Sequence, residues 1–249
     1  MEDLAWLSRT ELLVGHDTLV SFTKKHVLVV GMGGVGSFAA EFICRSGIGE
    51  MTIVDGDIVD PSNRNRQLPA LATTHGLPKV EIMAERLLAI NPELKLHIVK
   101  EFVNPEMVED ILNKNKFDYM VDAIDSFTPK ITFLKAAMER NIPLVSSMGA
   151  GGKLDPTQLK VVDISKTHSC PLAQQVRKKL RHLGIKRGLK AVFSPEIPIK
   201  ESLMLTDGTN YKKSAFGTIS YLPATFGATC ASVVIRGLID QYNKATLED

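Results

Sequence analysis

The chain has 249 residues, of which 44% are hydrophobic and 23% charged, and its formal net charge is +2 at pH 7. This ordinary globular composition excludes disordered, collagen-like and coiled-coil chains. Three cysteines without Cys-x-x-Cys spacing argue against a disulfide framework and against a paired-cysteine zinc clamp. The first fifteen residues lack the basic start and cleavage site of a secretory signal, so we expect a cytoplasmic protein.

The first half of the chain predicts strands that alternate with helices. Short apolar, β-branched runs indicate the strands, and apolar residues at helical spacing indicate the helices. The expected strands are residues 26–30, 51–54, 96–99, 119–123 and 143–147. The expected helices begin near residues 36, 78, 105 and 128, the last opened by Thr128-Pro129. This alternation predicts an α/β fold with a doubly wound, Rossmann-like, mostly parallel sheet.

Past Gly149 the pattern changes. Residues 159–164 and 191–194 predict strands with a basic helix between them, and residues 197–213 predict a long loop, which in a compact domain is usually functional or disordered. Residues 214–235 are uncharged but are interrupted by glycine and proline, so they predict a buried strand and helix and not a membrane span. We expect one domain over residues 1–249, with a C-terminal extension of the sheet.

A glycine-rich turn, GMGGVG, lies between the first strand and the first helix of this pattern. Its glycines are Gly31, Gly33, Gly34 and Gly36. Bare backbone amides and the positive end of a helix bind phosphate, and Asp55 ends the next strand, where a carboxylate can accept hydrogen bonds from ribose hydroxyls. The pattern predicts a nucleotide site that suits NAD or ATP equally well. The alternative is a turn whose glycines serve only close packing.

The segment DGDIVDPSNRNRQLP, which begins at Asp55, favours ATP. It carries amides and cations, and a lysine follows it: Asn63, Arg64, Arg66, Gln67 and Lys79. A site for NAD does not need this set. A triphosphate does, because Arg and Lys can neutralise the charge that builds on departing pyrophosphate.

The segment DAIDS places Asp122 and Asp125 at the carboxyl end of a strand, where open α/β sheets bind ligands. A carboxylate beside a triphosphate is a natural magnesium ligand. The alternative is an aspartate that caps the following helix, and we expect that role for Asp122 more than for Asp125.

Taken in order, these elements resemble the signature of the ubiquitin-activating-enzyme-like adenylyltransferases, which include enzymes of molybdopterin and thiamine biosynthesis. The matching elements are G-x-G-G-x-G, the ribose Asp, N-x-x-R-Q, the Lys of PKVE and D-x-x-D-S. The resemblance implies that a carboxylate is adenylated with ATP and Mg²⁺ and that pyrophosphate is released. It implies a nucleotide-binding half, residues 1–148, and a substrate-side half, residues 149–249. The implied catalytic residues are Arg66, Lys79 and Asp125, with Asp125 as the metal ligand. The implied nucleotide contacts are the four glycines, Asp55, Asp57, Asn63, Arg66, Gln67, Lys79 and Ser126.

The second half is similar to the tRNA threonylcarbamoyladenosine dehydratases. The segments that carry this similarity are GAGGKLDPTQ, DISKT, PLA and VFSPE. The resemblance implies that the threonyl carboxylate of a modified adenosine in tRNA is adenylated and that its carbamoyl group then closes a ring with loss of water. Tethering supplies a high effective concentration, so this step needs no enzyme nucleophile. The absent zinc clamp agrees with an RNA substrate.

Cys170 departs from the pattern of this family, and Arg9 matches it only loosely. Cys170 stands where the dehydratases lead us to expect an acidic residue; a catalytic thiol is the alternative to an inert packing residue, which we expect. Arg9 would match an arginine that reaches the triphosphate of a neighbouring subunit. The resemblance thus implies a homodimer, and a sulfur-transfer or activator protein is a further candidate partner.

The basic segment, residues 177–190, contains no acidic residue. Its cations are Arg177, Lys178, Lys179, Arg181, Lys186, Arg187 and Lys190. Composition alone favours a solvated helix face, and the sharper interpretation is a patch that binds tRNA phosphates.

Four functions therefore remain open at this point. The leading one is an ATP-dependent tRNA dehydratase, and the second is an adenylyltransferase that activates the C-terminal carboxylate of a ubiquitin-like sulfur carrier. An NAD(P) oxidoreductase is disfavoured because Arg66, Lys79 and Asp125 suit ATP. A non-catalytic nucleotide-binding adaptor would be expected to lose one of these three residues, and none is lost.

Overall fold

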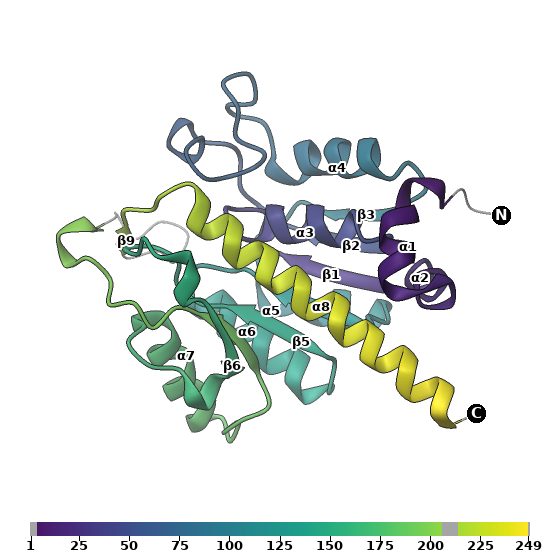
Figure 1. The fold of residues 1–249 in the computed structure, drawn as a ribbon. Helices are drawn as coiled ribbons and strands as arrows, with labels where there is room; N and C mark the ends of the chain where they lie inside the picture. The colour runs from purple at the N-terminus through teal and green to yellow at the C-terminus, as the bar shows by residue number, and fades with distance from the viewer. Residues whose placement is uncertain (1–3, 206–213, 249) are drawn as a thin grey trace.

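The computed structural model describes residues 4–205 and 214–248. Within them, seven strands form one sheet in the order β3-β2-β1-β4-β5-β7-β6, and β8 and β9 form a separate pair (Figure 1). The strands of the large sheet are β1 His26–Val30, β2 Glu50–Val54, β3 Lys95–Val99, β4 Tyr119–Asp122, β5 Leu144–Ser147, β6 Lys160–Asp163 and β7 Lys190–Phe193. The helices are α1 Ser8–Val14, α2 His16–Phe22, α3 Gly36–Cys44, α4 Lys79–Ile90, α5 Pro105–Lys114, α6 Phe127–Glu139, α7 Pro171–His182 and α8 Tyr221–Glu248.

The order of the strands confirms the predicted α/β fold class. Neighbouring strands from β3 through β7 are parallel, and only β6 at the edge runs antiparallel, against β7. The chain moves from β1 outward through β2 to β3, then returns to place β4 on the other side of β1. The carboxyl ends of β1 and β4 therefore flank the point where the strand order reverses, which is where open α/β sheets bind ligands.

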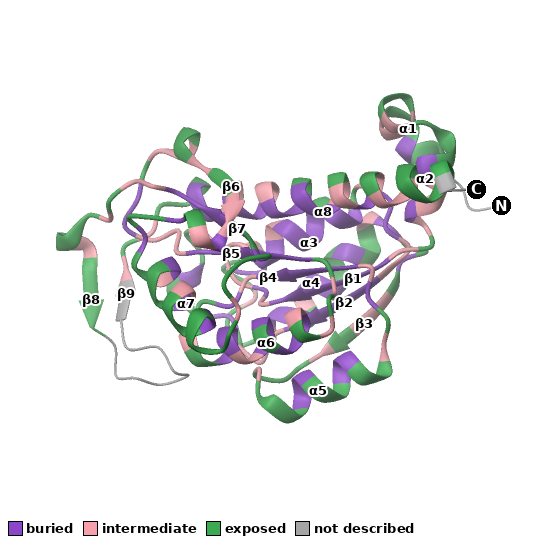
Figure 2. Ribbon diagram, turned by 90° about the horizontal axis from the view of Figure 1, so that it is seen from below, coloured by how far each residue is buried: buried purple, intermediate pink, exposed green. Residues whose placement is uncertain are grey.

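Helices cover both faces of the sheet and divide the core into two parts. Val27 and Val29 of β1 face a cluster built with α2, α3, α4 and α8, whereas Leu28 and Val30 face a cluster built with α5, α6 and α7. Because side chains alternate across a strand, a strand buried on both faces must be apolar throughout, as the run HVLVV after its first residue is. Figure 2 shows the central strands as buried along their length, while the outer helices carry exposed residues on one side.

The long helix α8 belongs to the first of these clusters. Leu222, Phe226, Cys230, Val234 and Leu238 recur at four-residue spacing and are buried. At Gly227 the helix approaches α3 so closely that an added Cβ would lie 2.8 Å from the Cβ of Phe38. The helix over residues 221–247 is long and apolar enough to cross a membrane, but half of its most apolar stretch is buried inside the protein. We therefore interpret α8 as a core helix, as the sequence predicted.

The substrate-side half extends the sheet as expected, through β7 and β6. The prediction of a long loop over residues 197–213 is wrong in part. Residues Leu203–Leu205 form β8, which pairs antiparallel with β9, Ser214–Phe216, while residues 206–213 lie outside the described part of the chain. The side chains of β8 are all exposed, and its sequence, Leu-Met-Leu, does not alternate between apolar and polar residues. The strand is therefore defined by its backbone pairing and could not be predicted from such an alternation.

Other boundaries shift by a residue or two. Ser126, and not Thr128, is the residue before the first turn of α6.

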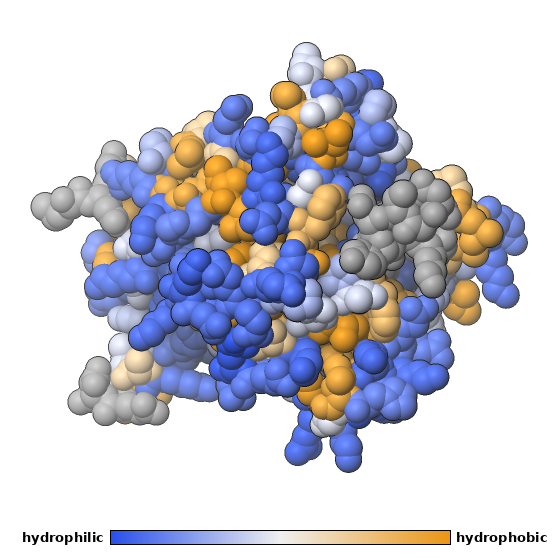
Figure 3. Space-filling view, turned by 180° about the vertical axis from the view of Figure 1, so that it is seen from behind, coloured by the Kyte–Doolittle hydropathy of each residue, from blue (hydrophilic) through white to orange (hydrophobic). Residues whose placement is uncertain are grey.

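Seen from behind, the surface is mainly hydrophilic, and hydrophobic side chains form small separate groups (Figure 3).

Candidate nucleotide-binding and active site

The glycine-rich turn joins the carboxyl end of β1 to the first turn of α3. Gly31 has a φ of +94°, and an added Cβ would lie 2.8 Å from the carbonyl oxygen of Ala123, directly after β4. A Cβ on Gly36 would collide with the carbonyl group of Gly31. Only glycine fits at these two positions, because the turn packs closely against the strand end beside it. The turn thus brings backbone amides and the positive end of α3 to the reversal point of the sheet.

Gly33 and Gly34 border residues of the segment after Asp55. A Cβ on Gly33 would lie 3.8 Å from Nε2 of Gln67, and one on Gly34 would lie 3.1 Å from the carbonyl oxygen of Arg66. The side-chain oxygen of Gln67 is buried and has no hydrogen-bond partner among the described residues. A buried acceptor of this kind costs free energy until a donor satisfies it. The structure therefore leaves an unsatisfied acceptor beside the phosphate-binding turn, where a nucleotide could supply the donor.

Asp55 follows β2 and holds the turn in place. Its carboxylate accepts hydrogen bonds from the backbone N–H of Met32 at 2.6 Å and of Asp57 at 2.8 Å. Burial raises the pKa of Asp55, and the positive charge of Lys79 and the two backbone donors oppose that rise. Each carboxylate oxygen can accept more than one hydrogen bond, so the predicted ribose contacts are compatible with this arrangement.

Lys79 and Asp57, both predicted as site residues, form an ion pair. Lys79 begins α4, is buried, and places its Nζ 3.0 Å from Oδ2 of Asp57. Its backbone N–H also donates to the carbonyl oxygen of Asp57. The pair positions one buried cation next to Asp55. We call the region at the carboxyl ends of β1, β2 and β4 that holds the glycine-rich turn, Asp55 and Lys79 the nucleotide crevice.

Arg66 and Asn63 lie on the segment between Asp55 and α4. Asn63 is buried, and its side-chain oxygen accepts the backbone N–H of Asp60 to close a tight turn, so its role in the described structure is to shape the segment. The guanidinium of Arg66 donates to the carbonyl oxygen of Ser62 at 2.9 Å and to the side-chain oxygen of Asn65 at 2.8 Å. Burial lowers the pKa of Arg66, and the nearby carboxylate of Asp125 opposes this effect.

The two aspartates of DAIDS have different environments. Asp122 is fully buried and pairs with Lys130 of α6, with 2.7 Å between Oδ2 and Nζ. It also accepts the hydroxyl of Ser146 and the backbone N–H of Ile124. The alternative interpretation of Asp122 as a helix cap is therefore wrong, because Ser126 precedes the first turn of α6 and Asp122 pairs with the buried lysine instead.

Asp125, by contrast, is exposed, three residues after the end of β4. Its Oδ1 accepts the hydroxyl of Ser126 at 3.3 Å, and its charge acts on Arg66. The structure thus brings Asp125 and Ser126 to the same place as the glycine-rich turn, Asp55, Lys79 and Arg66.

Lys130 is the residue that the sequence interpretation missed, although the sequence carries a signal for it. Residues 130, 133, 134 and 137 recur at helical spacing, and the last three are Phe133, Leu134 and Ala137. A lysine on the buried face of a helix needs a carboxylate partner, since burying an unpaired charge is costly. Its Nζ also donates to the carbonyl oxygens of Ile124 and Ser147, so it ties the DAIDS segment to the end of β5.

Arg9 does not join the site within one chain. It is exposed on α1, which is followed directly by α2. Asp17 of α2 and Tyr242 near the end of α8 line one groove, whereas Pro223 at the start of α8 contacts Gly34. A helix as long as α8 spans about 42 Å. In Figure 1, α1 and α2 accordingly lie at the side of the sheet where α8 ends.

The model of the ThiF family matches residues 7–248. The chain belongs to the ThiF family. Among its relatives is the tRNA threonylcarbamoyladenosine dehydratase of Bacillus subtilis, which is 48% identical over 77% of this chain and 75% of that enzyme. The enzyme of the same name from Escherichia coli is 38% identical over 94% of this chain and 95% of its own length.

Solved structures of ThiF-like folds agree with this relationship. The crystal structure of the E. coli tRNA N6-threonylcarbamoyladenosine dehydratase TcdA in complex with ATP superposes with a TM-score of 0.88 at 37% identity, covering 97% of this chain and 96% of that one. The complex of the same enzyme with AMP has a TM-score of 0.86 at 38% identity, covering 96% of this chain and 97% of that one.

In the second half of the chain, Cys170 is buried directly before α7 and its Sγ lies 3.8 Å from the position of a Cβ on Gly149. Lys153 is buried nearby and donates to the carbonyl oxygen of Ser194. Burial lowers the pKa of Lys153, and the carboxylate of Glu196 opposes that effect.

The basic segment, residues 177–190, extends away from the crevice. Arg177 is half-buried and donates to the carbonyl and hydroxyl oxygens of Thr167 at 2.6 Å each, so it serves the local fold. The other six cations of the segment are exposed. Its last part lines a groove of about 890 Å³ beside the first residues of β4, β5 and β7, at the edge of the sheet opposite the crevice.

Proposed function

We propose that this protein is an ATP-dependent tRNA threonylcarbamoyladenosine dehydratase. The observation that carries the proposal is the likeness to the E. coli enzyme over almost the whole of both chains, together with a solved complex of that enzyme with ATP. The predicted adenylation residues other than Arg9 also gather at one crevice, where the sheet reverses its strand order.

The proposed chemistry has two steps. A carboxylate oxygen of the threonyl group attacks the α-phosphorus of ATP, and the bond to pyrophosphate breaks. The carbamoyl group of the same nucleoside then attacks the activated carbonyl carbon and loses a proton, and AMP departs with one of the former carboxylate oxygens. The net change in the nucleoside is the loss of one water. The second step is intramolecular, so the enzyme needs to orient the groups and exclude water but does not need a nucleophile of its own.

The chain's own residues take distinct roles in this proposal. The amides of the glycine-rich turn and the start of α3 bind the phosphates, and Asp55 accepts hydrogen bonds from the ribose. Arg66 and Lys79 stabilise the charge that develops on pyrophosphate. The unsatisfied oxygen of Gln67 supports the proposed site, because a nucleotide donor would relieve its desolvation.

We propose that Mg²⁺ accompanies ATP and that Asp125 holds it. An exposed carboxylate at a strand's carboxyl end, beside an arginine, suits a hard cation that keeps several water ligands. When bound, the ion would neutralise phosphate charge. Asp122 is unsuited to this role because Lys130 already neutralises it.

We also propose that the protein acts as a homodimer. Arg9 lies beside the far end of α8, so only a second chain could bring it to a triphosphate. Light scattering would give the oligomeric state. Mixing Arg9→Ala with Asp125→Ala protein should restore part of the activity, because some mixed dimers then contain one intact site; no restoration would contradict a shared site.

The cellular setting is a proposal as well. Three free, buried cysteines suit a reducing cytoplasm, where tRNA is modified. A sulfur-transfer or activator protein is a further proposed partner, and the six exposed cations of the basic segment are the proposed contacts for tRNA phosphates.

One experiment tests the proposed function. The protein is incubated with ATP, Mg²⁺ and tRNA that carries threonylcarbamoyladenosine, and the digested nucleosides are analysed by mass spectrometry. We expect a nucleoside lighter by one water in the presence of ATP, and far less of it with Asp125→Ala protein over the same time. An unchanged nucleoside, with adenylation instead of a ubiquitin-like carrier protein, would contradict the proposal.

A further inference from the structure

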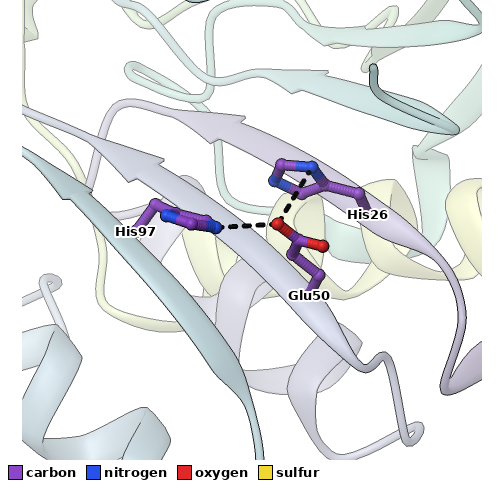
Figure 4. A group of neighbouring side chains, drawn as sticks. All are labelled: His26, Glu50 and His97. Atoms are coloured by element: carbon purple, nitrogen blue, oxygen red, sulfur yellow. Dashed lines mark hydrogen bonds and ion pairs between the residues drawn. The ribbon is translucent and has the colours of Figure 1, made fainter. Parts of the chain in front are cut away.

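Three side chains meet near the amino ends of the parallel strands β1 to β3, at the opposite end of the sheet from the nucleotide crevice. They come from three neighbouring strands: His26 begins β1, Glu50 begins β2, and His97 lies in β3. Oε1 of Glu50 is 3.6 Å from Nδ1 of His26 and 2.7 Å from Nε2 of His97. Figure 4 shows the Glu50 carboxylate between the two imidazole rings.

From this geometry we propose that His26, Glu50 and His97 form a binding site for one Zn²⁺ ion. One ligand atom from each residue lies within 4.8 Å of the other two. In a tetrahedral site with bonds of about 2.0–2.1 Å, ligand atoms are about 3.3 Å apart, which is between the two distances observed to Glu50. Small rotations of the side chains therefore suffice, and water would occupy the fourth position.

The surroundings of His26 prepare it as a ligand. Its Nε2 lies 2.8 Å from the hydroxyl of Thr52, and its ring packs on Phe117 with 4.5 Å between centroids. In the tautomer that donates Nε2–H to Thr52, Nδ1 presents its lone pair toward Glu50. A ligating histidine is usually oriented in this way by a hydrogen bond from its other nitrogen.

The other two ligands give access from solvent. The side chains of His97 and Glu50 are 42% and 27% exposed, whereas that of His26 is only 9% exposed, so an ion could enter along the β3 side.

Lys95 is the competitor for this site. Its Nζ lies 2.9 Å from Oε1 of Glu50, but its side chain is 66% exposed and can move into solvent. An ion that binds here must displace the ammonium group. Removing Lys95 should therefore tighten metal binding.

The test uses the full chain without an affinity tag, stripped of metal with a chelator and titrated with Zn²⁺ by calorimetry. We expect one ion per chain, and Co²⁺ should give the visible absorption of a tetrahedral complex. Glu50→Gln and His97→Gln should each weaken binding at least tenfold, Thr52→Val about tenfold, and Lys95→Ala should strengthen it. Zn²⁺ should raise the melting temperature of the parent but not of His97→Gln protein.

His16→Gln is the matched control. His16 also pairs with a glutamate, Glu11, at 2.9 Å, but on the exposed surface, outside the three-residue cluster. This variant should bind Zn²⁺ like the parent. The proposal is overturned if binding does not saturate at one ion per chain, or if His97→Gln protein binds as tightly as the parent. Each variant's melting temperature without metal shows whether it is folded, and none of these readouts depends on catalytic activity.

Discussion

The nucleotide crevice and the basic segment, residues 177–190, both concentrate charge, but they hold it differently. In the crevice, Lys79 is buried and paired with Asp57, and Arg66 is fixed by two oxygen acceptors. In the basic segment, six of the seven cations are exposed. Fixed, partly buried charges suit a small ligand whose reacting atoms must be positioned, whereas exposed charges suit a long polyanion bound through its counterions. We therefore expect substitutions in the crevice to impair ATP binding or turnover, and substitutions in the basic segment to impair tRNA binding.

The largest effect should come from the buried pair behind the crevice. Lys130→Met leaves the Asp122 carboxylate buried without its cation, and breaking such a pair costs about 3–5 kcal/mol of unfolding free energy. Denaturant unfolding measures this loss. Lys135→Met, on the same helix, removes an exposed lysine and should change stability by less than about 0.5 kcal/mol. Equal effects of the two substitutions would show that the Asp122–Lys130 pair contributes little.

Next in size is the loss of the proposed magnesium ligand. Asp125→Ala should lower turnover by about 10²–10³, since losing a group that stabilises developing charge has an effect of this order. The fold should persist, because Asp125 is exposed. Rates of pyrophosphate release measure the effect. Activity within a few-fold of the parent would show that Asp125 serves only the local structure.

A comparison of two further residues separates binding from catalysis within the crevice. Arg66→Ala should lower turnover at saturating ATP far more than it weakens ATP binding, because its proposed partner is charge that develops during the reaction. Asp55→Ala should mainly weaken binding, through lost ribose contacts. Calorimetry with ATP and steady-state kinetics give both quantities. If Arg66→Ala destroyed ATP affinity and left turnover normal, Arg66 would serve ATP binding and would not stabilise the developing charge.

Changing the exposed cations should give a smaller effect that depends on salt. Replacing Lys178, Lys179, Arg181 and Arg187 by alanine should raise the KM for tRNA, flatten the dependence of tRNA affinity on salt, and leave ATP binding unchanged. Filter binding at several salt concentrations measures the slope. The control is Lys135→Ala, since Lys135 is an exposed lysine on α6 outside the basic segment. An unchanged slope in the quadruple variant would show that the basic segment is a solvated surface.

The smallest effect concerns a charged group in the packing of α3 on α4. Glu41 accepts hydrogen bonds from Arg45 and Arg86. Burial raises its pKa, but the two arginines outweigh this effect and the net pKa is lowered. Its stabilisation is therefore complete above the ordinary value of 4.5 and is lost as the pH falls through the lowered pKa. Glu41→Gln should cost about 1 kcal/mol at pH 7, since the arginines are half exposed and screened by solvent. Urea unfolding should show the difference shrinking as the pH falls below 4.5; a constant difference would contradict it.

The nucleotide-binding half was predictable because its signals are local. An apolar run gives β1, glycines after it give the turn, and parallel strands put Asp55 and Asp125 at one edge. The pairing of Asp122 with Lys130 was also readable, from a lysine on the apolar face of a helix. The strand β8 was not, because its exposed side chains carry no pattern. The cluster of His26, Glu50 and His97 could not be predicted either, since it depends on the register that pairs His26 with Glu50 and His97 with Thr52 across three strands.

We propose that the protein adenylates the threonyl carboxylate at the nucleotide crevice before the ring closes. The most direct test uses tRNA whose threonylcarbamoyladenosine carries ¹⁸O in both carboxylate oxygens, incubated with the protein, ATP and Mg²⁺. Mass spectrometry of the released AMP should find one ¹⁸O, because the oxygen that attacks the α-phosphorus leaves with AMP. Cyclised nucleoside accompanied by unlabelled AMP would contradict the account.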